Sequence, residues 1–158
     1  MKPRNDGLIM DVNKTLLKGS DIFSIKETWN KEEAAKLPAR TLAYIGDAVY
    51  ELALRLNHVS IGIDGAGKLH DSLVGIVSSP AQAKVFDSIF PELPEEDMKM
   101  VKCWRNAKIP VRYGSGTRLE YAKATALEAW VGFLFVTGQT ERMIDVIQTA
   151  IKLSSSEE

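Results

Sequence analysis

Apolar residues recur at intervals of three and four along most of this chain, and that spacing predicts helices. The clearest helix is predicted between about Arg40 and Asn57, with one apolar stripe facing the core and Asp47 almost opposite it. The stripe is formed by Leu42, Ile45, Val49, Leu52 and Leu56. Apolar side chains also flank Asp47, so we expect its carboxylate to be covered. These flanking residues are Tyr44, Tyr50 and Leu54.

The rest of the chain continues the helical pattern, and no segment has the character of a strand series. We therefore predict an all-α domain of about six or seven helices. The remaining helices are expected at about 24–36, 69–77, 80–89, 95–107 and 118–136, and from a cap at Thr140 onward. The second half of 118–136 is apolar on nearly every side, which predicts a central, buried helix. Residues 108–117 form a predicted loop.

Two carboxylates stand out because small residues adjoin both. Gly46 precedes Asp47, and a glycine inside a helix costs roughly 1 kcal/mol relative to alanine, which is typical of a close approach by another backbone or a ligand. Glu128 lies in the apolar helix, and its helical neighbours Ala124 and Gly132 are small. We infer that the two faces cross and bring Asp47 and Glu128 together around a hard divalent cation, Mg²⁺ or Mn²⁺. The alternative for Glu128 is a buried ion pair with Arg40, Arg55 or Lys123.

Composition narrows the class of protein. The 158 residues, 45% of them hydrophobic, fit one domain with a sizeable core. One cysteine, Cys103, excludes an internal disulfide framework and is consistent with a reducing compartment. No apolar run approaches the roughly 20 residues that cross a bilayer, and the N-terminus lacks the pattern of a signal peptide. We therefore expect a cytoplasmic protein.

Charge is unevenly distributed along the chain. Seven cations and one anion lie between Lys99 and Lys123, so this segment carries +6, whereas the whole chain carries −1 and the remainder −7. A basic tract on an acidic protein suits contact with a phosphate backbone. A solvated helix face followed by a loop explains the same charges equally well.

Two motif-like strings carry less weight. Residues 62–68 match the first seven positions of a phosphate-binding P-loop, but Leu69 replaces the magnesium-binding Ser or Thr and no strand precedes the string. His70 and Asp71 resemble the dipeptide of the HD phosphohydrolases, which also need an upstream histidine and a later aspartate. His58 fills the first role only with difficulty.

A resemblance to a known family rests on two longer strings. The signature helix of the ribonuclease III family is similar to Leu42-Ala-Tyr-Ile-Gly-Asp-Ala-Val-Tyr-Glu51, and its second metal-binding helix to Thr125-Ala-Leu-Glu-Ala-Trp-Val-Gly132. The mini-ribonuclease III subfamily, which consists of the endonuclease domain alone, is the closer match, from about Leu37 to Leu153. Shorter supporting strings are Leu69-His70, Ile76-Val-Ser78, Gln82-Ala83 and Arg105-Asn-Ala-Lys108.

The resemblance implies a domain organisation. A ribonuclease III-like catalytic domain would span 37–153, after an N-terminal extension of uncertain structure at 1–36 and before a tail at 154–158 that should fray. No double-stranded-RNA-binding domain follows. Ala43 and Thr125 stand where full-length enzymes of the family have two further carboxylates. The mini-ribonuclease III subfamily also lacks these two carboxylates. Glu51 is our candidate for an auxiliary metal ligand.

The resemblance also implies an activity: Mg²⁺, with Mn²⁺ as a substitute, held by Asp47 and Glu128 activates water to cleave double-stranded RNA and leaves 5′-phosphate and 3′-hydroxyl ends. Family members are homodimers, and Tyr50 and Leu54 are our candidates for the interface. The implied substrate is the base-paired stem of precursor 23S ribosomal RNA. Our candidates for RNA contacts are Arg105, Asn106, Lys108, Arg112, Tyr113, Arg118 and Lys123.

Two rival functions remain open from the sequence. One is a non-catalytic RNA-binding or ribosome-associated protein with the same fold, against which the retained Asp47 and Glu128 argue, because a pure binder gains nothing from anions near RNA. The other is an HD-type phosphohydrolase acting on a nucleotide, which would need His70 and Asp71 for activity.

Overall fold

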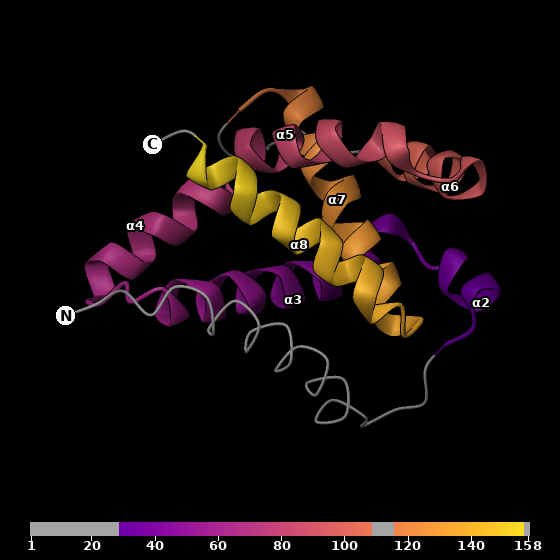
Figure 1. The fold of residues 1–158 in the computed structure, drawn as a ribbon. Coiled ribbons are helices and arrows are strands. Elements are labelled where there is room, and N and C mark those ends of the chain that lie inside the picture. The colour runs from indigo at the N-terminus through magenta and orange to yellow at the C-terminus, as the bar shows by residue number, and fades with distance from the viewer. Residues whose placement is uncertain (1–28, 109–115, 157–158) are drawn as a thin grey trace.

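The computed structural model describes residues 29–108 and 116–156, and every regular element in these two ranges is helical. The all-α prediction is confirmed (Figure 1). The elements are α2 (Lys31–Ala35), α3 (Ala39–Ser60), α4 (Ala66–Val77), α5 (Ser79–Ile89), the short 3-10 helix η1 (Phe90–Glu92), α6 (Glu95–Arg105), α7 (Arg118–Val136) and α8 (Thr140–Ser155).

Helix α7 is the centre of the fold, as its apolar sequence predicts. It packs against α3, α5, α6 and α8, and Figure 1 shows it passing behind α8 and across α3. Its start is set by a capping box, in which the Glu120 N–H donates to Thr117 Oγ1 (3.1 Å) and the Thr117 N–H donates to Glu120 Oε1 (2.9 Å). Its end is set by Gly138, whose φ of +71° favours glycine.

The contact between α3 and α7 is a crossing of two backbones. A Cβ built on Gly46 would overlap the backbone oxygen of Glu128 and lie 2.8 Å from the Gly132 nitrogen. A Cβ on Gly132 would overlap the backbone oxygen of Leu42. Glycine is therefore required on both helices at this point, and the small-residue crossing inferred from the sequence is confirmed.

The predicted core stripe of α3 is wrong in most of its members. Of its five residues, Leu42 is buried, whereas Leu52 is 40% exposed and Ile45, Val49 and Leu56 are partly buried. The face that packs against the core is centred on Gly46 and Ala53 instead, because small residues let α7 approach closely. Larger apolar side chains are displaced to the edges of the contact.

Both ends of the described domain carry regular contacts next to the predicted boundaries. The Trp29 N–H donates to the Val136 oxygen (2.9 Å), and Ala34 is fully buried in the core. Residues 29–36 therefore pack onto the domain that was expected to begin at residue 37. Helix α8 begins at Thr140 with Gln139 as its cap residue, and it continues to Ser155, within the segment expected to fray.

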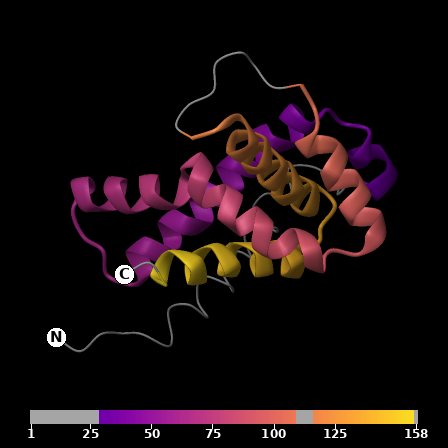
Figure 2. The same ribbon diagram turned by 90° about the horizontal axis from the view of Figure 1, so that it is seen from above.

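Helix α4 lies at one end of the molecule, where it extends beyond the other helices (Figure 2). It contacts α3, α5 and α8 less extensively than α7 contacts its neighbours. Apart from residues 109–115, 1–28 and 157–158, which lie outside the described ranges, no helix is long and apolar enough to cross a membrane.

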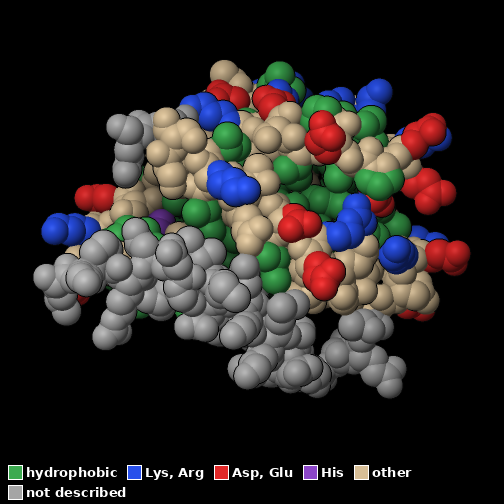
Figure 3. Space-filling model, viewed as in Figure 1, with side chains coloured by type: hydrophobic (Ala, Val, Ile, Leu, Met, Phe, Trp, Pro, Cys, Tyr) green, Lys and Arg blue, Asp and Glu red, His purple; other side chains and the backbone are tan. Residues whose placement is uncertain are grey.

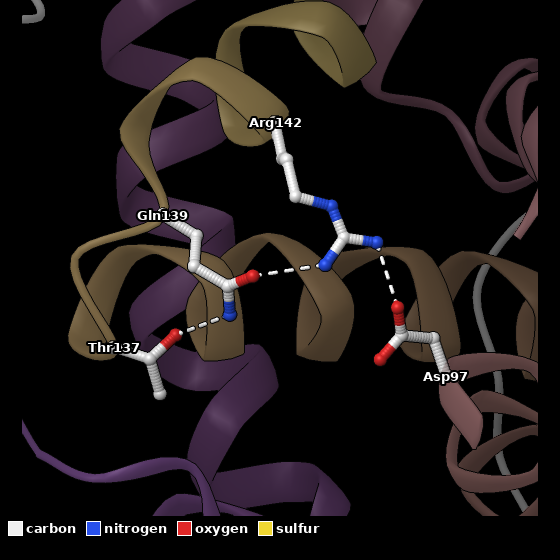
Figure 4. Close-up of polar contacts among 4 residues, drawn as sticks. All are labelled: Asp97, Thr137, Gln139 and Arg142. Atoms are coloured by element: carbon white, nitrogen blue, oxygen red, sulfur yellow. Dashed lines mark hydrogen bonds and ion pairs between the residues drawn. The ribbon is translucent and has the colours of Figure 1, made fainter. Parts of the chain in front are cut away.

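A polar network ties the start of α8 to α6 (Figure 4). Arg142 donates from Nη2 to Asp97 Oδ2 (2.7 Å) and from Nη1 to Gln139 Oε1 (2.9 Å), while Gln139 Nε2 donates to Thr137 Oγ1 (2.8 Å). The Arg142 guanidinium also lies 5.0 Å from the ring centroid of Trp130. The network therefore joins α6, the segment that follows α7 and the start of α8.

The glycine crossing predicts a sharp contrast between two alanine substitutions. Gly46→Ala should lower the free energy of unfolding by about 2–4 kcal/mol, because backbone atoms of α7 cannot move aside as a flexible side chain would. Gly75→Ala, in the last turn of α4 with nothing within 4 Å of the new Cβ, should raise it by about 0.5–1 kcal/mol. Denaturant unfolding of both variants measures the difference, and equal effects would contradict the crossing.

Candidate active site

Three carboxylates lie beside the crossing. Asp47 follows Gly46 on α3 and is exposed, Glu51 is one turn further along α3, and Glu128 projects from α7 and is partly buried. The sequence-based expectation that Asp47 and Glu128 come together is supported by their mutual electrostatic repulsion. The expectation that Asp47 is covered is wrong, since its neighbour Tyr44 is 84% exposed and points away from the core.

Burial and electrostatic repulsion raise the pKa values of two of these carboxyls, Glu128 and Asp47. Burial, then the charges of Asp47 and Glu51, raise the pKa of Glu128 from 4.5 to about 7, although a side-chain hydrogen bond from Gln82 lowers it. Burial and the charge of Glu51 also raise the pKa of Asp47 above its usual range. Asp47 and Glu128 therefore lack a nearby positive charge that would stabilise both in the ionised form.

The alternative explanation for Glu128, an ion pair within the protein, finds no support. Lys123 Nζ lies 2.7 Å from Asp87 Oδ1, and Arg55 Nη2 lies 3.5 Å from Glu51 Oε2. Neither these cations nor Arg40 forms an ion pair with Glu128. The Arg55–Glu51 pair spans one turn of a helix surface, where such contacts are weak.

Two uncharged side chains adjoin the Glu128 carboxyl. Tyr50 on α3 and Gln82 on α5 are 0% and 2% exposed. Gln82 lies close enough to make a weak hydrogen bond to the Glu128 carboxyl, but neither Gln82 Nε2 nor Tyr50 Oη completes a hydrogen bond of good geometry. Burial and the charge of Glu128 raise the pKa of Tyr50 far above its usual range. A buried polar group without a well-formed hydrogen bond costs about 1–3 kcal/mol. Both the Tyr50 and the Gln82 side chain are therefore unusual in a well-packed protein core.

Gln82 has no predicted role in the site. Its burial can nevertheless be inferred from the sequence, because Gln82 precedes Phe86 by four residues and Ile89 by seven and so lies on the inward stripe of α5. A glutamine on a stripe of buried apolar residues indicates a polar partner in the core.

These donors and acceptors suit a hard divalent cation. The carboxylates offer oxygen ligands, and orphaned buried polar atoms adjoin them. Within the described residues, no three His, Cys, Asp or Glu side chains converge closely enough to hold a metal ion by themselves. Mg²⁺ commonly takes one or two carboxylates and completes its shell with water and substrate phosphates, so a site with Asp47 and Glu128 as its protein ligands would be sufficient.

The predicted RNA-contact residues are distributed unevenly. Lys108 and Arg118 are exposed on either side of residues 109–115, and Arg112 and Tyr113 lie outside the described residues. Asn106 is exposed, whereas Arg105 packs over the Phe90 ring at 5.6 Å. The Lys123 side chain is only 19% exposed and already paired with Asp87. On the face seen in Figure 3, basic and acidic side chains are intermixed.

The predicted dimer-interface residues are wrong. Tyr50 and Leu54 are both 0% exposed within the protomer, because they face α7 and leave no surface for a partner. The opposite side of α3 carries the exposed apolar side chains instead. They are Tyr44 (84%), Leu52 (40%) and Val59 (63%).

A separate cavity of about 740 Å³ lies between the ends of α3, α4 and α8, and none of the three carboxylates lines it. His58 lines it, is 3% exposed and has an Nδ1 atom without a hydrogen-bond partner, and burial lowers its pKa. Asp71 on α4 lines the same cavity, and His70 is exposed on α4. Among the described residues, His58, His70 and Asp71 do not form a group of three that could hold a metal ion.

Comparisons with known proteins identify several relatives of this chain. The model of the "Ribonuclease III domain" family matches residues 40–139. A "Mini-ribonuclease 3" of Brevibacillus brevis is 35% identical over 80% of this chain and 98% of its own length. One from Symbiobacterium thermophilum is 39% identical over 72% of this chain and 88% of its own length. A crystal structure of a Fusobacterium nucleatum protein superposes with a TM-score of 0.68 at 29% identity, over 74% of this chain and 93% of that one.

The raised pKa of Glu128 predicts how stability depends on pH without metal. Between pH 4.5 and about 7 the unfolded chain has lost this proton while the folded protein retains it, so stability should fall as pH rises through that window. Glu128→Gln removes this contribution and should be more stable than wild type at pH 8 by on the order of 1–3 kcal/mol, with little difference at pH 4.5. Thermal unfolding in chelator checks it, and parallel pH profiles for the two proteins would contradict it.

Proposed function

The chain belongs to the ribonuclease III family of endoribonucleases, and we propose that it is a cytoplasmic, Mg²⁺-dependent member that cleaves double-stranded RNA. The observation that supports the proposal is the glycine crossing, beside which Asp47 and Glu128 repel each other and, among the described residues, neither forms an ion pair with a cation. The exposure of Asp47 leaves this group open to a substrate.

The residues divide the chemistry as follows. Asp47 and Glu128 would hold Mg²⁺, with Glu51 as an auxiliary ligand, and the ion would activate water for in-line attack and stabilise the departing 3′ oxygen. Gly46 and Gly132 hold α3 against α7, so the carboxylates keep their spacing when RNA binds. Cleavage by this route leaves a 5′-phosphate and a 3′-hydroxyl. With the pKa of Glu128 at about 7, this carboxyl becomes an effective ligand at neutral and higher pH.

Duplex RNA would be read by its shape, through phosphates and 2′-hydroxyls across the minor groove. Lys108 and Arg118 are exposed at the two ends of the segment that contains Arg112 and Tyr113, so this segment remains our candidate contact loop. Lys123 is a weaker candidate, because Asp87 already neutralises it. The natural substrate in this proposal is the stem of precursor 23S ribosomal RNA.

The working unit in this proposal is a homodimer, so that one site faces each strand of the duplex. The exposed apolar side of α3 supports it: Tyr44, Leu52 and Val59 occur at intervals of eight and seven residues and form one stripe. Exposed apolar stripes of this kind are typical of protein interfaces. Glu51 lies between this stripe and the buried face of α3, so the interface would adjoin the carboxylates.

Cleavage of a long double-stranded RNA with Mg²⁺ tests the activity directly. Asp47→Asn and Glu128→Gln should each reduce the rate by about a thousandfold or more, because each removes a principal ligand. Glu51→Gln should reduce it by roughly tenfold, as expected of an auxiliary ligand. Asp145→Asn, an exposed carboxylate on α8, is the matched control and should cleave at the wild-type rate.

The same assay separates the rival function. Duplex binding without cleavage by wild type, in Mg²⁺ and in Mn²⁺, would favour a non-catalytic RNA-binding protein. Circular dichroism of each variant ensures that lost cleavage reflects lost chemistry and not lost folding.

The dimer surface predicts a change of mass in sedimentation. A Tyr44→Lys, Leu52→Lys double variant should sediment as a monomer, since two charges would have to be buried in the interface. Val74→Lys, at a residue on α4 that is 48% exposed, should remain dimeric like wild type. A monomeric wild type would refute the dimer, and a dimeric double variant would refute the surface.

A further inference from the structure

Two hydrogen-bond donors lie beside Glu128, and in the metal-free protein Gln82 makes only a weak hydrogen bond to its carboxyl while Tyr50 makes none. Tyr50 comes from α3 and Gln82 from α5, so the carboxyl on α7 lies among three helices. Both side chains are at least 98% buried, and neither Tyr50 Oη nor Gln82 Nε2 completes a hydrogen bond of good geometry. Polar atoms of two other helices thus lie beside the Glu128 carboxyl without adding well-formed hydrogen bonds that would stabilise the fold.

These side chains are poor choices for a purely structural core. Replacing an unsatisfied buried polar group by an apolar group of the same shape is neutral or stabilising. Phenylalanine would fill the place of Tyr50, and methionine that of Gln82. The polar atoms therefore point to a state of the protein in which they have partners.

The ionised form of Glu128 supplies those partners. A carboxylate has about four lone-pair sites, so it can bind a metal ion and accept hydrogen bonds at the same time. Carboxylates that bind metals are commonly held by hydrogen bonds from neighbouring side chains. A phenol O–H and an amide N–H are donors, so they cannot bind the cation through these atoms. They can orient the carboxylate that does.

We propose that Tyr50 and Gln82 are positioning residues, which donate from Oη and Nε2 to the ionised Glu128 carboxylate and hold it in one orientation for a divalent cation. This proposal rests on the proposed function, because it assigns Glu128 to metal binding. It adds two residues to the site that make contact with neither substrate nor metal. Their donors would face the carboxylate oxygens on the side that the cation does not occupy.

The test compares metal binding with metal-free stability in the full chain, with Mn²⁺ as the probe. Gln82→Met and Tyr50→Phe should each weaken Mn²⁺ binding by about 10–100-fold, as measured by calorimetry or by electron paramagnetic resonance. The melting temperature of each variant in chelator should equal or exceed that of wild type, because an unsatisfied polar atom has been removed. Loss of function with unchanged or increased stability is a pattern that a structural role does not produce.

A matched control removes another orphaned atom away from the carboxylates. His58 Nδ1 is also buried without a partner, and 11 residues along α3 separate it from Asp47, about 16 Å of helix. His58→Leu should leave Mn²⁺ affinity unchanged. Asp47→Asn, in contrast, should abolish the binding that wild type shows.

The outcomes distinguish the two proposals. If Mn²⁺ binds wild type but not Asp47→Asn, and binds Gln82→Met and Tyr50→Phe as it binds wild type, the positioning role is refuted while the metal site stands. Weaker binding accompanied by an equal loss of metal-free stability would also refute it. If wild type binds no Mn²⁺, the proposed function and the positioning role both fail.

Discussion

The backbone contact between Gly46 and Gly132 is the constraint on which the rest of the structure depends. Because a Cβ at either position would overlap the opposite backbone, α3 and α7 can cross only there. Asp47 follows one of these glycines, and Glu128 precedes the other by one turn of α7. The spacing of the carboxylates is therefore set by main-chain atoms, which are less adaptable than side chains.

The crossing brings the Glu128 carboxyl close to Asp47, and among the described residues no cation forms an ion pair with either of them. Burial and repulsion raise the pKa of Glu128, and the hydroxyl of Tyr50 and the amide of Gln82 lie beside it without well-formed hydrogen bonds. These unfavourable contributions are confined to the carboxylate group. Elsewhere the fold is stabilised by favourable contacts, for example the stacking of Trp130 on Phe133 at 5.7 Å and the hydrogen bonds of Arg142. Concentration of such conflicts at one place is typical of a functional site.

The two faces of α3 serve different purposes. One side packs on α7 through small residues and Tyr50, and the other carries Tyr44 and Leu52 exposed to solvent. Glu51 lies between them. In the proposed dimer, a single helix would thus connect the core, the carboxylates and the partner surface, so a shift of α3 would disturb all three together.

The sequence by itself determined the helical class, the approximate limits of α7, and the crossing of the small-residue faces of α3 and α7. It did so because periodicity, caps and a mid-helix glycine are local signals. It also carried the strings that resemble the ribonuclease III family, which the comparisons confirm. Only the tertiary structure decided which face of α3 is buried, because glycine and alanine form the closest contact although they weigh little in hydrophobic patterns. For the same reason it moved Tyr50 from the surface to the core, and it placed Gln82 beside Glu128, a contact between residues 46 positions apart that no local pattern encodes.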